Sequence, residues 1–323
     1  QLAGNKSVND PNEKCRIFGG LGLAALHIGQ AELAMETLQD AVLIQPEQEG
    51  LQRLIAEAFF QANQRSEAIL KARNVVKMSP NDAGNLLWFA EFMAKVDEIA
   101  EAISTMQVIT QLMPEKPELW LKRAGLEVEN GDREAAQQSL QTMLRLEGLK
   151  HEDYRLAALT YLRMQDKTAA MACLDLANDN SSEGSPEFLL EMTCLNFRLE
   201  RNENALESCL KLTKTLPNDG ILQVLQADIL CNLEHWQQAL SCLDRALETW
   251  EKGRQTGELG RWQRLVNSGW IRKDWLASAN RLGMISLRKA IIYQRISEVD
   301  LAQQHIELSL QQLENNTASI IFA

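Results

Sequence analysis

Alanine recurs along this chain at an interval of 34 residues, with one inserted residue before the last two positions. The seven alanines of the series are Ala34, Ala68, Ala102, Ala136, Ala170, Ala205 and Ala239. A repeat that continues through most of a chain requires similar small units in series, because no single large core has such a period. The sequence therefore predicts a repeat array.

A second column of small residues lies twelve positions before each alanine. It consists of Gly22, Ala56, Ala90, Ala124, Ala158, Thr193 and Ala227. Two antiparallel helices can approach closely only where their side chains are small, so each pair of columns predicts the contact within one helical hairpin. Large apolar residues follow each alanine at helical spacing, as at Leu140 and Met143, and would fill the space between successive hairpins.

Turn signals separate the two predicted helices of each unit. Asn130-Gly131-Asp132 is interpreted as a C-cap, a left-handed turn residue and an N-cap. The turn recurs in weaker form at Gly29-Gln30, Asn63-Gln64 and Gln165-Asp166. Proline follows the predicted second helix at Pro46, Pro80, Pro114 and Pro217. It stops the helix because it lacks the N–H needed to continue it.

This unit resembles the tetratricopeptide repeat. The best single match consists of Trp120, Ala124, Gly131, Ala136, Leu140 and Met143. The resemblance implies an all-α, right-handed solenoid whose first helices line a concave groove, in a family composed overwhelmingly of adaptors and scaffolds. We predict about seven to eight helix–turn–helix units. Seven of them cover residues 15–252, after a polar, flexible lead-in at residues 1–14.

Residues 253–323 depart from the repeat register. We expect an extra helix rich in Trp and Arg, then a divergent eighth repeat from about residue 283 to 316, marked by Ala290 and Ala302, and an apolar tail. The extra segment suggests a second surface for an acidic partner or a membrane, formed by Arg261, Trp262, Arg264, Trp270 and Arg272. Alternatively, its tryptophans pack the end of the array. The tail either docks on the last helices or continues into further chain, and this end offers a route to self-association.

Composition restricts the partner and the compartment. The net charge of −11 argues against nucleic-acid binding. The sequence contains no run of 18 or more apolar residues, so we predict no integral membrane segment. The six cysteines include no Cys-x-x-Cys pair, which favours a reducing, cytoplasmic compartment, although a periplasmic or secreted location stays open. The chain starts at Gln1 without a visible signal peptide, so we expect a processed or excised piece.

Motifs for catalysis are missing from the sequence. The four histidines lack metal-ligand spacing, and neither a phosphate-binding Gly-x-x-x-x-Gly-Lys nor a Gly-x-Ser-x-Gly occurs. We therefore predict no enzyme activity, no metal and no cofactor.

In the repeat register, a set of first-helix residues is expected on the concave face. They are Leu23, Leu26, Arg53, Glu57, Phe60, Leu87, Glu91, Lys122, Arg155, Leu159, Leu162, Arg163, Phe197, Arg198 and Asp228. Some members of the family bind a peptide's terminal carboxylate with a lysine–asparagine–arginine clamp spread over three repeats. Leu23, Glu57 and Glu91 occupy the positions of the asparagines, so we predict no such clamp. Leu and Phe with scattered Arg suit an amphipathic helix or an extended segment with acidic residues. Alternatively, several leucines pack between neighbouring first helices.

Two functions follow from this pattern. The first is a non-catalytic scaffold or adaptor that binds a peptide, helix or partner domain in the groove. The alternative is the substrate-recruiting arm of a larger enzyme or regulator, such as a glycosyltransferase or a signalling ATPase, whose catalytic domain lies outside this chain.

Overall fold

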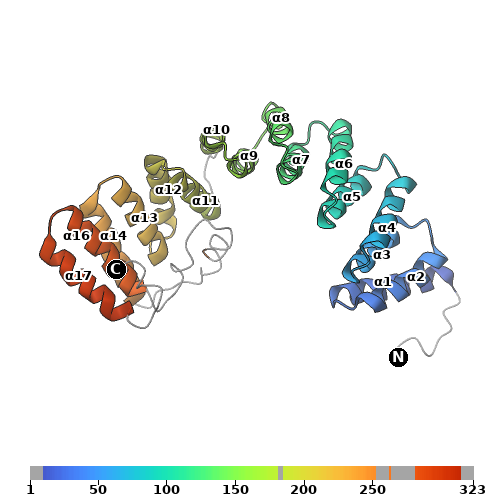
Figure 1. The fold of residues 1–323 in the computed structure, drawn as a ribbon, viewed down its shortest axis with the longest axis horizontal. Helices are drawn as coiled ribbons and strands as arrows, with labels where there is room; N and C mark the ends of the chain where they lie inside the picture. The colour runs from blue at the N-terminus through green and yellow to red at the C-terminus, as the bar shows by residue number, and fades with distance from the viewer. Residues whose placement is uncertain (1–9, 181–184, 252–261, 263–280, 314–323) are drawn as a thin grey trace. The chain divides into compact units, whose positions relative to one another are not determined.

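The computed structural model describes residues 10–180, 185–251, 262 and 281–313. All secondary structure within these ranges is α-helical (Figure 1). The first helices of successive hairpins are α1 (Pro11–His27), α3 (Glu49–Gln61), α5 (Ala83–Lys95), α7 (Pro117–Glu129), α9 (His151–Arg163), α11 (Pro186–Arg198), α13 (Gly220–Asn232) and α16 (Arg281–Arg295). The second helices are α2 (Ala31–Ile44), α4 (Arg65–Met78), α6 (Ile99–Leu112), α8 (Arg133–Met143), α10 (Lys167–Asp179), α12 (Asn202–Thr215), α14 (Trp236–Glu251) and α17 (Val299–Leu313).

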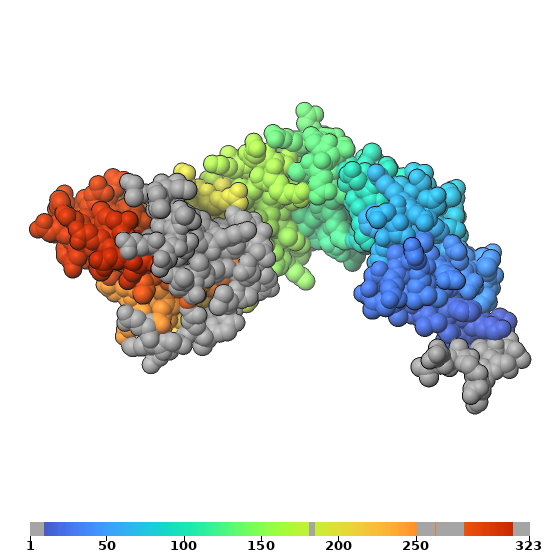
Figure 2. Space-filling view, turned by 60° about the horizontal axis from the view of Figure 1, so that its bottom comes forward, coloured from blue at the N-terminus to red at the C-terminus, as the bar shows by residue number. Residues whose placement is uncertain are grey.

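The chain forms two compact units, residues 1–178 and residues 179–323. Unit 1 contains the helices from α1 through nearly all of α10, and unit 2 contains those from α11 to α17. The space-filling view shows the early hairpins of unit 1, from blue to green, packed as one continuous surface (Figure 2). The predicted fold class, an all-α solenoid of helical hairpins, is confirmed, whereas the handedness of its superhelix stays a prediction.

The two columns of small residues form the contact inside each hairpin. All seven alanines of the second-helix column are fully buried, and Ala302 continues the column in α17 at 6% exposure. In α1, the small residue must be glycine, because a Cβ on Gly22 would lie 2.4 Å from Cγ of Leu38. The sequence-based explanation of the repeat, close approach at small side chains, is therefore confirmed.

A residue in the left-handed conformation ends the first helix of every described hairpin. Its φ lies between 59° and 81°, at Gly29, Asn63, Asp97, Gly131, Gln165, Glu200, Glu234 and Ser297. In each turn the next N–H donates to a carbonyl five residues earlier, for example from Asp132 to Glu127 at 2.9 Å. This 6→1 hydrogen bond defines a Schellman motif. The turns predicted at Gly29, Asn63, Gly131 and Gln165 are confirmed, whereas Asp97, Glu200, Glu234 and Ser297 adopt the same conformation at positions where no turn was predicted.

Each proline predicted to stop a second helix lies two residues beyond its end. Three of these prolines also connect one hairpin to the next, because their carbonyls accept a hydrogen bond from a side chain in the following first helix. The donors are Gln52, Trp120 and Gln223, at 2.8 to 2.9 Å. These three prolines therefore help to position the start of the next hairpin as well as to end the previous one.

Candidate functional site

Apart from Leu26, eleven of the predicted groove residues lie on the first helices of unit 1, from Leu23 on α1 to Arg163 on α9. Leu26 is buried at 8% exposure and packs in the core, so its placement on an open groove was wrong. Leu23 is exposed at 41%, whereas Leu87, Leu159 and Leu162 are half-buried. Part of each of these half-buried leucines packs within the fold, and the remainder is exposed to solvent.

Ion pairs join neighbouring first helices along this face. Lys95 on α5 contacts Glu57 on α3 at 2.5 Å, and Lys122 on α7 pairs with Glu91 on α5. Arg163 on α9 contacts Glu129 on α7 at 3.1 Å. These side chains are 26% to 54% exposed, so each pair contributes at most about 1 kcal/mol to stability.

These pairs change the expected chemistry of the face. The sequence interpretation emphasised basic residues available to an acidic partner, but Lys122 and Arg163 already have carboxylate partners. It omitted Lys95 and Glu129, although Glu129 precedes Arg163 by one repeat length of 34 residues. Opposite charges one repeat apart on first helices are the signal that would have identified this pair.

An aromatic cluster lies between α3 and α5, with Phe92 buried and Trp88 and Phe60 half-buried. Trp88 stacks on Phe92 with ring centroids 5.2 Å apart, and Phe60 meets Phe92 edge-on at 6.1 Å. The guanidinium of Arg53 lies 5.5 Å from the Trp88 ring, and the ammonium of Lys95 lies 4.9 Å from the Phe60 ring. Cation–π contacts of this kind hold the two long basic side chains against the face.

Polar contacts fix the base of this cluster. Arg53 donates to the side-chain oxygen of the buried Asn85, whose amide nitrogen donates to Glu49 at 2.7 Å. Hydrogen bonds from Ser79 and Asn85 lower the pKa of Glu49, because they stabilise its ionised form. Arg53 is therefore a positioned side chain between two helices, not a freely moving surface cation.

A hollow of about 330 Å³ opens on the face between α5 and α7. Its walls include Ala90, Ala94, Gly125, Leu126 and Met106. Charged side chains of the ion pairs also line it, namely Glu91, Lys122 and Glu129. It thus joins apolar walls to a charged rim within one unit.

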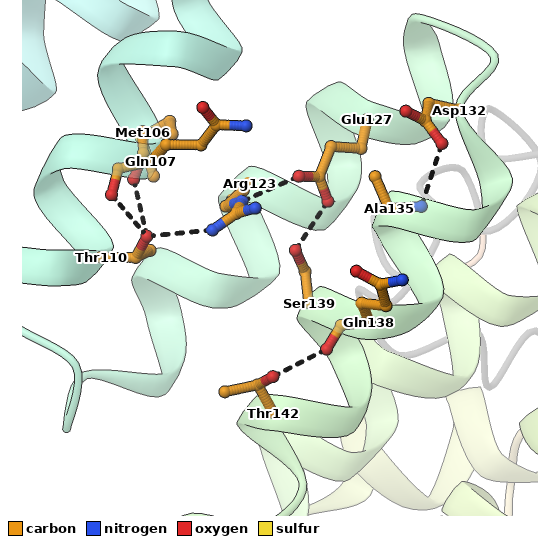
Figure 3. Close-up of polar contacts among 10 residues, drawn as sticks. All are labelled: Met106, Gln107, Thr110, Arg123, Glu127, Asp132, Ala135, Gln138, Ser139 and Thr142. Carbon is orange, nitrogen blue, oxygen red and sulfur yellow. Dashed lines mark hydrogen bonds and ion pairs between the residues drawn. The ribbon is translucent and has the colours of Figure 1, made fainter.

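A buried polar network lies between α6, α7 and α8 (Figure 3). Glu127, 1% exposed, accepts from Nε of Arg123 at 2.7 Å and from the hydroxyl of Ser139 at 2.7 Å. Arg123 also donates to Thr110 at 3.3 Å, and the Thr110 hydroxyl donates in turn to the carbonyl of Met106. Both carboxylate oxygens of Glu127 are satisfied, as a buried charge requires.

Two of the three predicted groove residues of unit 2, Phe197 and Asp228, have structural partners. Phe197 packs against the core of that unit, and Arg198 is exposed. Asp228 accepts two hydrogen bonds from Arg288 at 2.7 and 2.9 Å, which join α13 to α16. In unit 1, Arg155 is half-buried and contacts Glu152 at 2.5 Å.

The proposed second surface is only partly within the described residues. Trp262 is 1% exposed, and its indole N–H donates to Asp219 at 2.8 Å, so its assignment to a surface was wrong. Asp219 also caps α13 through its other oxygen, which explains why the indole is held there. Trp262 instead packs in the core of unit 2, in line with the alternative that the tryptophans of this segment pack within the array. Arg261, Arg264, Trp270 and Arg272 lie outside the described residues.

The cysteines behave as small core residues. Five of the six are buried, and burial raises the pKa of Cys194 to about 12 and that of Cys173 to about 11. Such thiols stay protonated near neutral pH. Across the described part of the chain, three or more His, Cys, Asp or Glu side chains nowhere gather in a metal-binding group. None of the described helices is long and apolar enough to cross a membrane.

Repeated hairpins with a buried small-residue contact, a left-handed turn and a first-helix face define an α-helical repeat protein. Within that class, the fold of this chain is that of tetratricopeptide repeat proteins. The C-terminal part of a TPR repeat-containing protein from Cytophaga hutchinsonii superposes with a TM-score of 0.56 at 13% identity, over 82% of this chain and 97% of that one. This likeness shows the fold alone.

Two further solved structures have lower scores. A tetratricopeptide repeat protein from Parabacteroides merdae gives a TM-score of 0.46 at 14% identity, over 73% of this chain and 93% of that one. YrrB, described as a TPR protein with an unusual peptide-binding site, gives 0.42 at 15% identity, over 55% and 91%. No family model and no curated protein matches the sequence.

Proposed function

We propose that this chain is a non-catalytic protein-interaction scaffold, and that it binds a peptide, a helix or a partner domain along the first-helix face of unit 1. Proteins with this fold are generally interaction scaffolds. The observation that most supports the proposal is the hollow between α5 and α7, which leaves apolar walls open beside the ion pairs. Hairpin packing alone does not require such an opening.

The rest of the face supports the same proposal. Three ion pairs and the aromatic cluster hold long side chains in defined positions across α3, α5, α7 and α9. A preorganised surface loses less conformational entropy when a partner binds. The net charge of −11 disfavours nucleic acid as that partner. The six free cysteines are compatible with a reducing compartment, and we propose a cytoplasmic location.

Charge reversal on the face tests this proposal. The double substitution Leu159→Glu with Arg163→Glu places new carboxylates on α9 and removes the partner of Glu129. The matched control, Leu70→Glu with Lys77→Glu, makes the same change in net charge on exposed positions of the second helix α4. Cross-linking followed by mass spectrometry would compare the partners captured by each form, with circular dichroism to verify folding.

We expect the α9 variant to lose partners that the wild type and the α4 control retain. If the two variants capture the same partners in the same amounts, binding does not involve the first-helix face. If the folded wild-type chain captures no partner at all, the scaffold function itself is wrong.

A further inference from the structure

Gly125 on α7 lines the hollow between α5 and α7. The residues at the equivalent register positions, 34 residues apart, are Glu57 on α3, Glu91 on α5 and Leu159 on α9. Each of these residues carries a side chain longer than a methyl group. Gly125 carries none, and the hollow lies beside its backbone.

Gly125 is not required by packing. A Cβ built on it would meet its nearest neighbour, a guanidinium nitrogen of Arg163, only at 4.0 Å, which is an ordinary van der Waals distance. By contrast, a Cβ on Gly22 would collide with Leu38 at 2.4 Å. Glycine inside a helix also lowers its stability relative to alanine. The missing side chain at position 125 therefore gives the fold no advantage.

Each charged side chain that lines the hollow, within the described part of the chain, belongs to an ion pair. Glu91 is paired with Lys122, and Glu129 with Arg163, so the charges around it neutralise one another. Its walls are apolar, formed by Ala90, Ala94, Leu126 and Met106. The complementary occupant is consequently an uncharged, apolar group.

The charged rim around the hollow suits a peptide that carries this apolar group. The four charged side chains of the two ion pairs are each about half exposed, at 46% to 54%. Their carboxylates can accept from peptide N–H groups, and their cationic heads can donate to peptide carbonyls. An extended backbone offers both kinds of group at regular intervals.

Resting on the proposed function, we infer that the hollow over Gly125 is an anchor site that takes one large apolar side chain, such as Leu, Met or Phe, from an extended peptide segment. The neighbouring ion pairs bind the backbone on either side of this anchor. The site is specific to α5 and α7, because Gly125 is its defining residue.

The test replaces small residues that line the hollow with leucine, which should fill it. Gly125→Leu places an apolar side chain where the peptide anchor would bind, and better helix propensity should preserve or raise the melting temperature. Ala94→Leu fills the same space from α5 and serves as a second variant. Gly20→Leu is the matched control, since Gly20 is exposed in α1 and a Cβ there has no neighbour within 4 Å.

The probe is a display library of random linear peptides selected on the wild-type chain, followed by calorimetry of individual peptides. We expect enrichment of one large apolar residue per peptide, and a loss of affinity of about tenfold or more for Gly125→Leu with no change for Gly20→Leu. Replacing the enriched residue by alanine in the peptide should weaken wild-type binding similarly.

The outcomes separate the two proposals. Peptides that lose affinity for Leu159→Glu with Arg163→Glu, yet bind Gly125→Leu as tightly as wild type, would overturn the anchor site and leave the binding face intact. Peptides indifferent to every first-helix variant would overturn both proposals. A wild-type chain that dimerises in light scattering, when Gly125→Leu does not, would assign the hollow to a second copy and overturn the peptide as its occupant.

Discussion

The hairpins α7–α8 and α13–α14 share one register but differ in their interiors. Ala124 and Ala136 correspond to Ala227 and Ala239, and all four are fully buried. Three residues further along each first helix, however, α7 buries Glu127 whereas α13 buries Leu230, at 1% and 2% exposure. At two further equivalent positions, α7–α8 has Arg123 and Ser139 where α13–α14 has Gln226 and Cys242.

This difference shows which positions the repeat fixes. Close helix contact requires the small residues, but the neighbouring interior position accepts either hydrocarbon or a charge whose hydrogen bonds are satisfied. The two solutions do not have equal energies. Burying an ion pair requires desolvation of both charges, whereas burying leucine is favourable by itself. We therefore expect α7–α8 to depend on a complete network and α13–α14 on packing.

The largest effect should come from breaking that network. Glu127→Ala leaves Arg123 and Ser139 without their shared acceptor and should lower the free energy of unfolding by about 3–5 kcal/mol, nearer the lower figure because Arg123 is 20% exposed. Urea denaturation followed by circular dichroism measures this. Glu134→Ala, an exposed carboxylate on α8, is the control and should change stability little. A small effect of Glu127→Ala would mean that the network is not stabilising.

The next effect comes from giving α7–α8 the interior of α13–α14. The triple substitution Arg123→Gln, Glu127→Leu and Ser139→Cys removes both charges together and should leave stability unchanged or raise it by up to about 4 kcal/mol. Hydrogen exchange of the α7 amides reports this locally. A triple variant less stable than Glu127→Ala would show that the charged interior is intrinsically better suited to this hairpin.

The first helices of the two hairpins also differ in what their glycines tolerate. A Cβ on Gly220 in α13 would lie 2.3 Å from Nε1 of Trp250, so Gly220→Ala should cost about 1–3 kcal/mol. Gly125→Ala in α7 meets nothing closer than 4.0 Å and should gain about 0.5–1 kcal/mol. Melting curves of the two variants should therefore shift in opposite directions, and shifts of the same sign would contradict this account.

The smallest effect concerns the turns. Glu234 ends α13 with φ 59°, whereas Gly131 ends α7 with φ 81°. Side chains with a Cβ are strained in this region, so Glu234→Gly should stabilise by about 0.5–1 kcal/mol and Gly131→Ala should destabilise by about as much. Thermal unfolding of both variants tests the pair. If Gly131→Ala is neutral, packing between hairpins, and not the residue, determines this conformation.

Much of the fold could be predicted because it depends on periodic sterics. The spacing of Ala34, Ala68 and their successors directly encodes the contact between helices, and the prolines encode where second helices end. The left-handed turns at Glu200 and Glu234 could not be found from local preference, because glutamate rarely adopts this conformation by itself.

The candidate site was less predictable, since it depends on pairs of residues and on a missing side chain. Repeat register places Glu91 and Lys122 on one kind of face, but their pairing requires the angle between α5 and α7. The glycine at position 125 does not by itself indicate a binding site. The hollow beside it is defined by residues of α5, α6 and α7 together, so it is recognised only in the folded structure. Likewise, the burial of Trp262 depends on Asp219, which lies 43 residues earlier.

The constant left-handed turn has a consequence for how the chain can change in length. Successive turn residues are 34 residues apart from Gly29 to Gln165, then 35 to Glu200, while 63 residues separate Glu234 from Ser297. In every case the turn geometry is preserved, so the additional residues were accommodated outside the turn. Deleting or duplicating one whole period should therefore give a shorter or longer array that folds, whereas removing a few residues from within a hairpin should not.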